Sequence, residues 1–170
     1  MDLLEIIKDR RSIRQYLSRE IEQEKLEKIL EAAQWAPSAS NRQPWHFIVV
    51  QNSKTRHQLA KLHPHGRFMS KSPVVIVVLG DPDVHPKYYL SDPHQAVQNI
   101  LLTAFWLGLG TCWMGVRGAP FEQDMKELLK IPEALHVVCT ISIGYSNQTR
   151  TSTRKPLNDI VSWETYGEKK

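Results

Sequence analysis

The sequence has little of what marks several large classes of protein. Its two cysteines, Cys112 and Cys139, both lie in apolar runs, so they indicate buried free thiols and not a disulfide framework. No run of about 18 apolar residues is present, so no membrane-spanning helix is expected. The N-terminal stretch MDLLEIIKDRR lacks the long apolar region of a secretory signal peptide. We therefore expect a cytoplasmic protein without a membrane partner.

Several motifs that carry known chemistry are missing as well. The glycines of GLGTCWMG (108–115) do not have GxGxxG spacing, and no P-loop is present, which argues against both classes of nucleotide site. The histidines occur without HExxH or CxxC spacing, so no metal site is expected. No nucleophile elbow surrounds a serine or cysteine. The net charge of +4 comes without a nucleic-acid-binding module, so no nucleic-acid partner is expected.

What is present fits a single domain over residues 1–170, with the hydrophobic and charged content of a globular chain. Apolar residues spaced i, i+3, i+4 and i+7 predict a helix over 22–35, and the run VVIVVL (74–79) predicts a strand buried on both faces. The other expected elements are helices near 3–7, 53–62 (capped by Ser53), 91–107 and 120–129, and strands at 46–51, 111–116 and 137–144. Two helices precede the first strand, which favours an α+β fold with a central mixed, mainly antiparallel sheet of four to five strands flanked by helices.

Two stretches outside these elements have distinct characters. Residues 80–93 contain three prolines and predict a loop or lid. Residues 145–170 are polar and predict an extended arm, yet they carry Trp163 and Tyr166 near the end. Aromatic side chains on a polar extension usually dock onto another surface, and a second subunit is the natural candidate.

An arginine cluster near the N-terminus indicates an anion site. Arg10, Arg11, Ser12 and Arg14 lie in RRSIRQY, which we expect to be extended. Side chains alternate along an extended segment, so Arg10, Ser12 and Arg14 share one face. Arginine binds phosphate in a bidentate manner and serine adds a hydroxyl donor, so a phosphate monoester fits. A solvated basic segment is the alternative interpretation.

Three weaker signals accompany this cluster. Arg154 and Lys155 on the arm can close over the same anion, although a solvated arm is the favoured interpretation of these two residues alone. The loop PSASNRQPW (37–45) offers hydroxyls and amides that match the edge of a heterocycle carrying both C=O and N–H, and a polar turn between helix and strand is the alternative. Gly115 would let a ligand approach the backbone closely, and a tight turn is its alternative.

In order along the chain, RRSIRQY, KLEKILEAAQWAPSASNRQPWHFIVV, SPVVIVV, QAVQNILLTAFWLGLGTCWMG and GY…RKPLNDIV resemble the FMN-dependent nitroreductase family, over about residues 7–161. The resemblance implies an intertwined homodimer with FMN at the subunit interface. It assigns cofactor contacts to Arg10, Arg11, Ser12, Arg14, Pro37, Ser38, Ala39, Ser40, Asn41, Gln43, Arg67, Trp113, Met114, Gly115, Arg154 and Lys155.

The resemblance also implies a role for each segment. Residues 10–14 hold the phosphate, the ribityl chain and the pyrimidine end, and Arg154, with Lys155, reaches the phosphate. Residues 37–43 reach the flavin largely from the second subunit, and the backbone of 113–115 lies along the ring and can donate to N5. Arg14 is the expected cation beside N1 and C2=O, and Arg67 is a second candidate.

The implied activity is transfer of hydride from NADH or NADPH through flavin N5 to nitroaromatic, quinone or similar acceptors by a ping-pong mechanism. Solvent can supply the protons, so we assign no catalytic side chain. The short 80–93 segment predicts an open pocket with loose substrate choice. Three alternatives stay open at this point: a different flavin chemistry such as substrate dehydrogenation or dehalogenation, a non-catalytic FMN-binding protein, and a basic nucleic-acid binder.

Overall fold

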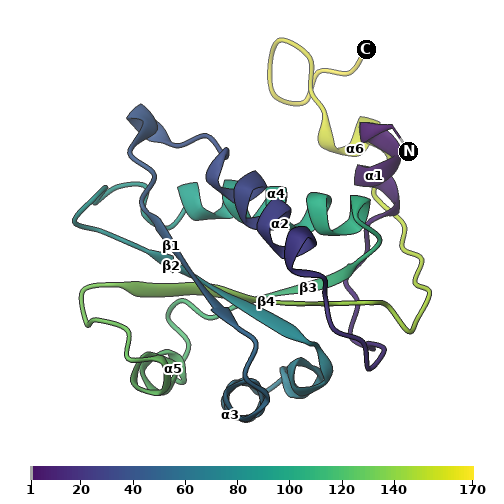
Figure 1. The fold of residues 1–170 in the computed structure, drawn as a ribbon. Helices are drawn as coiled ribbons and strands as arrows, with labels where there is room; N and C mark the ends of the chain where they lie inside the picture. The colour runs from purple at the N-terminus through teal and green to yellow at the C-terminus, as the bar shows by residue number, and fades with distance from the viewer. Residues whose placement is uncertain (1) are drawn as a thin grey trace.

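A computed structural model describes residues 2–170 and has a four-stranded sheet at its centre (Figure 1). The strands are β1 (Trp45–Val50), β2 (Val74–Gly80), β3 (Gly110–Gly115) and β4 (His136–Gly144), in the spatial order β1-β2-β4-β3. All three neighbouring pairs are antiparallel. The expected sheet is thus confirmed with four strands. Among the described residues its mixed character is limited to one parallel bridge, between Ser12 and Thr111.

Helices cover both faces of the sheet, which confirms the α+β class (Figure 1). One face carries α1 (Leu3–Asp9), α2 (Gln23–Gln34) and α4 (Asp92–Trp106), and the other carries α3 (Ser53–Leu62) and α5 (Glu122–Leu129). Short 3₁₀ turns follow α2 and α3, namely η1 (Ala39–Asn41) and η2 (Arg67–Lys71), and α6 (Leu157–Ile160) lies on the C-terminal arm. In the described part of the chain, no helix is long and apolar enough to cross a membrane.

The apolar run in β2 explains this layered arrangement. Every residue of β2 is buried, and successive side chains point to opposite faces of a strand. Ile76 and Val78 belong to the core shared with α2 and α4, whereas Val75 and Val77 belong to the core shared with α3 and α5. A strand that is apolar at every position therefore needs a helical layer on each side. Cys112 and Cys139 are free and buried, as expected.

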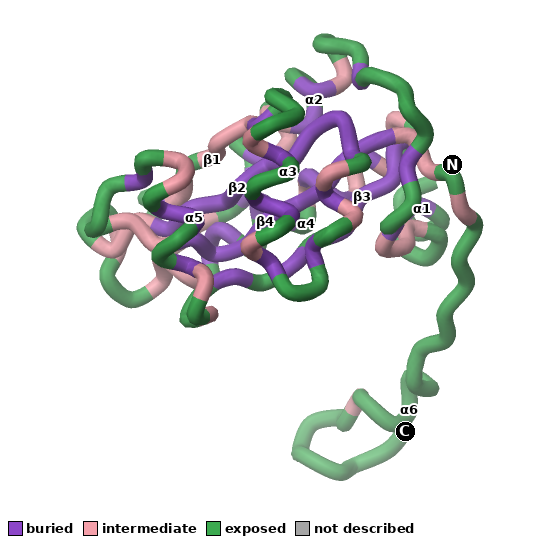
Figure 2. Tube along the Cα trace, turned by 90° about the horizontal axis from the view of Figure 1, so that it is seen from below, coloured by how far each residue is buried: buried purple, intermediate pink, exposed green. Residues whose placement is uncertain are grey.

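The N-terminal segment and the C-terminal arm flank the β3 side of the sheet. Ile13 N donates to Thr111 O at 2.8 Å and Leu17 N donates to Tyr145 O at 2.9 Å, so residues 10–17 lie against the sheet in an extended course. Ser146 still pairs with Tyr16, and Asn147 N donates to Gln15 O at 2.9 Å. Beyond these residues the arm extends away from the body and is exposed along most of its length (Figure 2). The predicted arm is confirmed, and its one short helix is α6.

Candidate functional site

The basic face predicted from strand-like alternation is present in the structure. Burial raises the pKa of the Cys112 thiol, while the charges of Arg14, Arg150 and Arg10 and a hydrogen bond with Ser12 act in the opposite direction. Because all four groups act on one thiol, they lie around the same point beside β3. Arg150 was not expected there. Its place in RTSTRKP, four residues before Arg154, was the signal available in the sequence.

The C-terminal arm adds another cation to this cluster. The pKa of Arg10 is lowered, first by burial and then by the positive charges of Arg11 and Arg154. The structure therefore brings Arg154 close to Arg10 across 144 positions of sequence. Arg154 and Lys155 are both exposed on the arm. Clustered cations repel one another, so a bound anion would relieve this cost as well as accept their hydrogen bonds.

Arg11 points away from the other members of its segment. Together with Ile13 and Arg150 it lines a cavity of about 330 Å³ between the end of α4 and the start of the arm. Its Nη1 donates to the backbone carbonyl of Arg10 at 2.6 Å and also to that of Lys8, and its Nε is buried without a partner. The alternation that unites Arg10, Ser12 and Arg14 thus separates Arg11 from them.

Strand β3 lies at the edge of the sheet and leaves backbone groups free on its outer side. Thr111 O accepts from Ile13 N on the side facing away from β4. Backbone groups of an antiparallel strand alternate in direction with every residue, so the N–H and C=O of Trp113 and Gly115 face this same outer edge. Trp113 and Gly115 are exposed, whereas Met114 is buried. The edge offers hydrogen-bonding groups to a ligand lying along it.

Gly115 leaves room for such a ligand. A Cβ atom placed there would meet nothing closer than the Trp113 ring at 3.9 Å, and its φ is not in the left-handed region. Neither packing nor backbone conformation within the chain therefore demands a glycine. Without a side chain, the backbone at this position is open to close approach.

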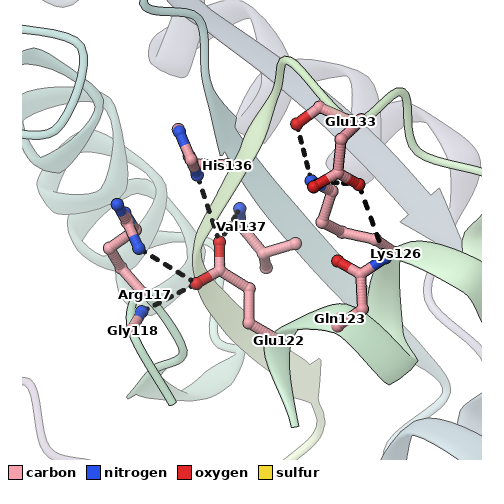
Figure 3. A network of polar contacts seen from close by, with 8 residues as sticks. All are labelled: Arg117, Gly118, Glu122, Gln123, Lys126, Glu133, His136 and Val137. Atoms are coloured by element: carbon pink, nitrogen blue, oxygen red, sulfur yellow. Dashed lines mark hydrogen bonds and ion pairs between the residues drawn. The ribbon is translucent and has the colours of Figure 1, made fainter. Parts of the chain in front are cut away.

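The segment after Gly115 is held by a buried carboxylate (Figure 3). Glu122 accepts from Gly118 N at 2.7 Å, from Val137 N at 3.1 Å and from Arg117 Nη1 at 3.3 Å. These bonds tie the connection between β3 and α5 to the beginning of β4. The end of the β3 edge is therefore rigidly placed.

The loop 37–44 has an unusual backbone. Ser40, Asn41 and Gln43 have φ of 52°, 53° and 52°, a left-handed conformation that non-glycine residues rarely adopt. The loop holds this shape through its own bonds, including one from Gln43 N to Ser38 Oγ at 2.9 Å. Strained residues of this kind cluster at ligand-binding sites.

This loop lies far from the arginine cluster within one chain. Ala39 N donates to the buried Asp92 carboxylate at 3.0 Å, which anchors the loop at the start of α4, and Pro37 is exposed beside it. In Figure 1 the connection from α2 to β1 lies on the opposite side of the molecule from α1. The loop residues and the arginine cluster therefore form two separate groups in a single chain, on opposite sides of the molecule.

The second cationic candidate lies near the first group. The Arg14 guanidinium lies 5.8 Å from the centre of the Phe68 ring, in η2. Arg67 precedes Phe68 and is exposed. No group of three or more His, Cys, Asp or Glu side chains suited to a metal ion occurs within residues 2–170.

The sequence profile of the Nitroreductase family matches residues 7–65 and 63–145. The chain belongs to the nitroreductase family. A family member from Methanothermobacter thermautotrophicus, provisionally named NADH dehydrogenase/NAD(P)H nitroreductase, is 43% identical over 150 residues, which cover 85% of this chain and 78% of that protein.

Solved structures of other nitroreductase-family members have the same fold. A provisionally named NADH dehydrogenase/NAD(P)H nitroreductase from Parabacteroides distasonis has a TM-score of 0.92 at 32% identity, covering 96% of this chain and 98% of that one. An FMN-dependent nitroreductase from Clostridium difficile has a TM-score of 0.90 at 34% identity, covering 96% and 99%. The family match thus extends over nearly the whole of each chain.

Proposed function

We propose that this chain is an FMN-dependent oxidoreductase that passes electrons from NADH or NADPH to nitroaromatic, quinone or similar acceptors. Membership of the nitroreductase family supports this, and so do the names of its relatives. They include an FMN reductase [NAD(P)H] from Bacillus subtilis, which is 28% identical over 188 residues, covering 97% of this chain and 74% of that protein.

The observation that carries the proposal is the character of the β3 edge. Cations gather at its beginning, near Thr111, and the Gly115 N–H faces outward at its end. Four residues of a strand span roughly 13 Å, so the edge suits an elongated ligand that is anionic at one end and flat at the other. The absent side chain at Gly115 and the clustered guanidiniums, of which that of Arg10 is partly buried, both fit FMN.

Within this arrangement Arg10, Ser12 and Arg154 would hold the phosphate. Arg14, near the middle of the edge, would stabilise negative charge at the pyrimidine end of the ring. The Gly115 N–H would donate to N5. When bound, FMN supplies the capacity to accept a hydride and pass electrons on, and the protein supplies binding and orientation.

We also propose that the working unit is a homodimer in which residues 37–43 of one chain complete the site of the other. Their distance from the arginine cluster within one chain supports this arrangement. Large apolar side chains exposed on the body and on the arm give it a surface: Leu3, Leu4, Ile7, Trp35, Trp106, Leu157, Ile160, Trp163 and Tyr166. A monomer with bound FMN in light scattering would contradict the dimer.

An anaerobic absorbance titration of FMN-loaded protein with NADH, and then with NADPH, tests the activity. Bleaching of the oxidised-flavin band, and its return on adding a quinone or nitroarene, is expected. If FMN binds but neither donor bleaches it, the activity is a different flavin chemistry or none, and the reductase proposal is wrong. If no flavin binds, the proposed site itself is wrong.

A further inference from the structure

His63 is a buried side chain that contacts the open edge of β3. It directly follows α3 and has an exposed fraction of 7%. Its Nε2 lies 3.4 Å from Gly115 O, and its Nδ1 lies 3.2 Å from His65 N. Because a backbone N–H can only donate, Nδ1 must be the acceptor, which places the proton on Nε2. The ring therefore donates to the Gly115 carbonyl.

The ring is held in this orientation by its surroundings. Its centre lies 4.8 Å from that of Phe121. The backbone of Gly66 lies so close that an added Cβ would approach the His63 Cβ to 2.6 Å. Burial lowers the pKa of His63, and the charge of His65 acts in the same direction, against the opposing effect of the Gly115 hydrogen bond. His63 is therefore neutral at pH 7 and retains its acceptor at Nδ1.

The contact matters because the Gly115 N–H and C=O face the same edge. A flavin N5 carries a lone pair in the oxidised ring and an N–H in the reduced ring, so the oxidised ring needs a donor there and the reduced ring needs an acceptor. A free Gly115 carbonyl would serve the reduced ring. Because His63 already donates to that carbonyl, the oxygen is a weaker acceptor for a second donor, and the Gly115 N–H remains as the stronger partner offered to the ligand.

We propose that His63 is a positioning residue that engages the Gly115 carbonyl and thereby favours binding of oxidised over reduced FMN. This inference rests on the proposed function. It assigns His63 an influence on the flavin potential without contact between the histidine and the flavin.

Two substitutions of His63 distinguish the effect of its hydrogen bond to Gly115 O from the effect of having any polar side chain at this position. His63→Asn is long enough to accept from His65 N but too short to reach Gly115, whereas His63→Gln carries an N–H donor at about the position of Nε2. His57→Asn is a matched control, because His57 is an exposed histidine on α3. The measurement is the dissociation constant of oxidised and of reduced FMN for each protein, with the midpoint potential as the independent check.

His63→Asn is expected to shift the ratio of the two constants about two- to tenfold toward the reduced form, the range that one hydrogen bond supplies. For a two-electron couple a tenfold change is about 30 mV, toward a more positive potential. His63→Gln and His57→Asn are expected to keep the wild-type ratio. An unchanged ratio in His63→Asn, or an equal shift in His63→Gln, would overturn the inference and leave the proposed function intact.

A measurement on the flavin-free wild-type protein requires no variant to fold. The ¹⁵N shifts of His63 are expected to show a proton on Nε2 and a lone pair on Nδ1. A proton on Nδ1 would overturn the inference directly. Wild-type protein that binds no FMN would instead overturn the proposed function, and the inference with it.

Discussion

Replacing Glu122 by glutamine tests whether the buried carboxylate holds the end of the β3 edge. The carboxylate accepts two backbone N–H groups, from Gly118 and Val137, and both are hydrogen bonds to a charged group. In Glu122→Gln the amide oxygen can still accept one of them, but the NH₂ group faces the other donor. One buried N–H is then left without a partner.

The magnitude follows from these two bonds. A hydrogen bond to a charged group contributes about 1.5–3 kcal/mol, and a neutral one about 1 kcal/mol. Losing one such bond and weakening the other predicts a loss of roughly 2–4 kcal/mol in the free energy of unfolding. At about 2–4 °C per kcal/mol for a chain of this size, the melting temperature falls by roughly 10 °C.

Urea unfolding of the flavin-free protein at fixed concentration measures this loss. The midpoint concentration should fall while the slope m is unchanged, since the surface exposed on unfolding is the same. Glu24→Gln is the matched control, because Glu24 is exposed on α2 and pairs with Lys28 at 2.6 Å in solvent. A loss below about 1 kcal/mol for Glu122→Gln, or one equal to that of the control, would refute the account of Glu122 as a buried clamp.

Three further outcomes are expected. Gly115→Val should leave the melting temperature nearly unchanged, because nothing lies closer than 3.9 Å to the new Cβ. It should weaken FMN binding more than about tenfold, because the side chain blocks the edge. Unchanged affinity in a fluorescence titration would contradict the proposed site. Arg10→Ala should weaken FMN binding about tenfold, while riboflavin, which lacks the phosphate, binds as before. The control is Lys54→Ala, on the exposed face of α3. Equal losses of affinity for both ligands in Arg10→Ala would place the phosphate elsewhere. Burial raises the pKa of Cys139 from 9.0 to about 12, so the folded thiol stays protonated where the unfolded one ionises. The contribution of this thiol to the free energy of unfolding is therefore complete below about pH 9 and is lost as the pH rises toward 12. The urea midpoint of the wild-type protein should therefore decrease as the pH is raised from 9 to 11. The urea midpoint of Cys139→Ala should decrease less over this range.

The sequence was sufficient for the features that arise from local pattern. The fully apolar run of β2 predicted a strand covered on both faces, and the i, i+3, i+4 spacing predicted α2. Alternation along RRSIRQY correctly placed Arg10, Ser12 and Arg14 on one face. These predictions succeed because each depends on neighbours within a few positions.

Most features that were missed depend on contacts between distant positions, and the cap of α3 is the local exception. Ser53 was expected to cap α3, but the cap is Asn52, whose side chain accepts from Thr55 N, so the helix has the expected start with a different capping residue. Nothing in the spacing of HPHG indicated that His63 would meet Gly115, 52 positions later. The buried role of Glu122 was equally hidden, because a glutamate in the first turn of a helix is ordinarily solvated.

The open edge of β3 has a consequence for handling the protein. Unpaired backbone N–H and C=O groups at a sheet edge can pair with a strand of another molecule, and short exposed edges are where aggregates of sheet proteins begin. At Trp113 and Gly115 no charged side chain or proline guards the edge. The groups proposed to receive FMN are thus also the groups most exposed to misassociation. Protein purified without flavin is expected to precipitate sooner than protein kept saturated with it.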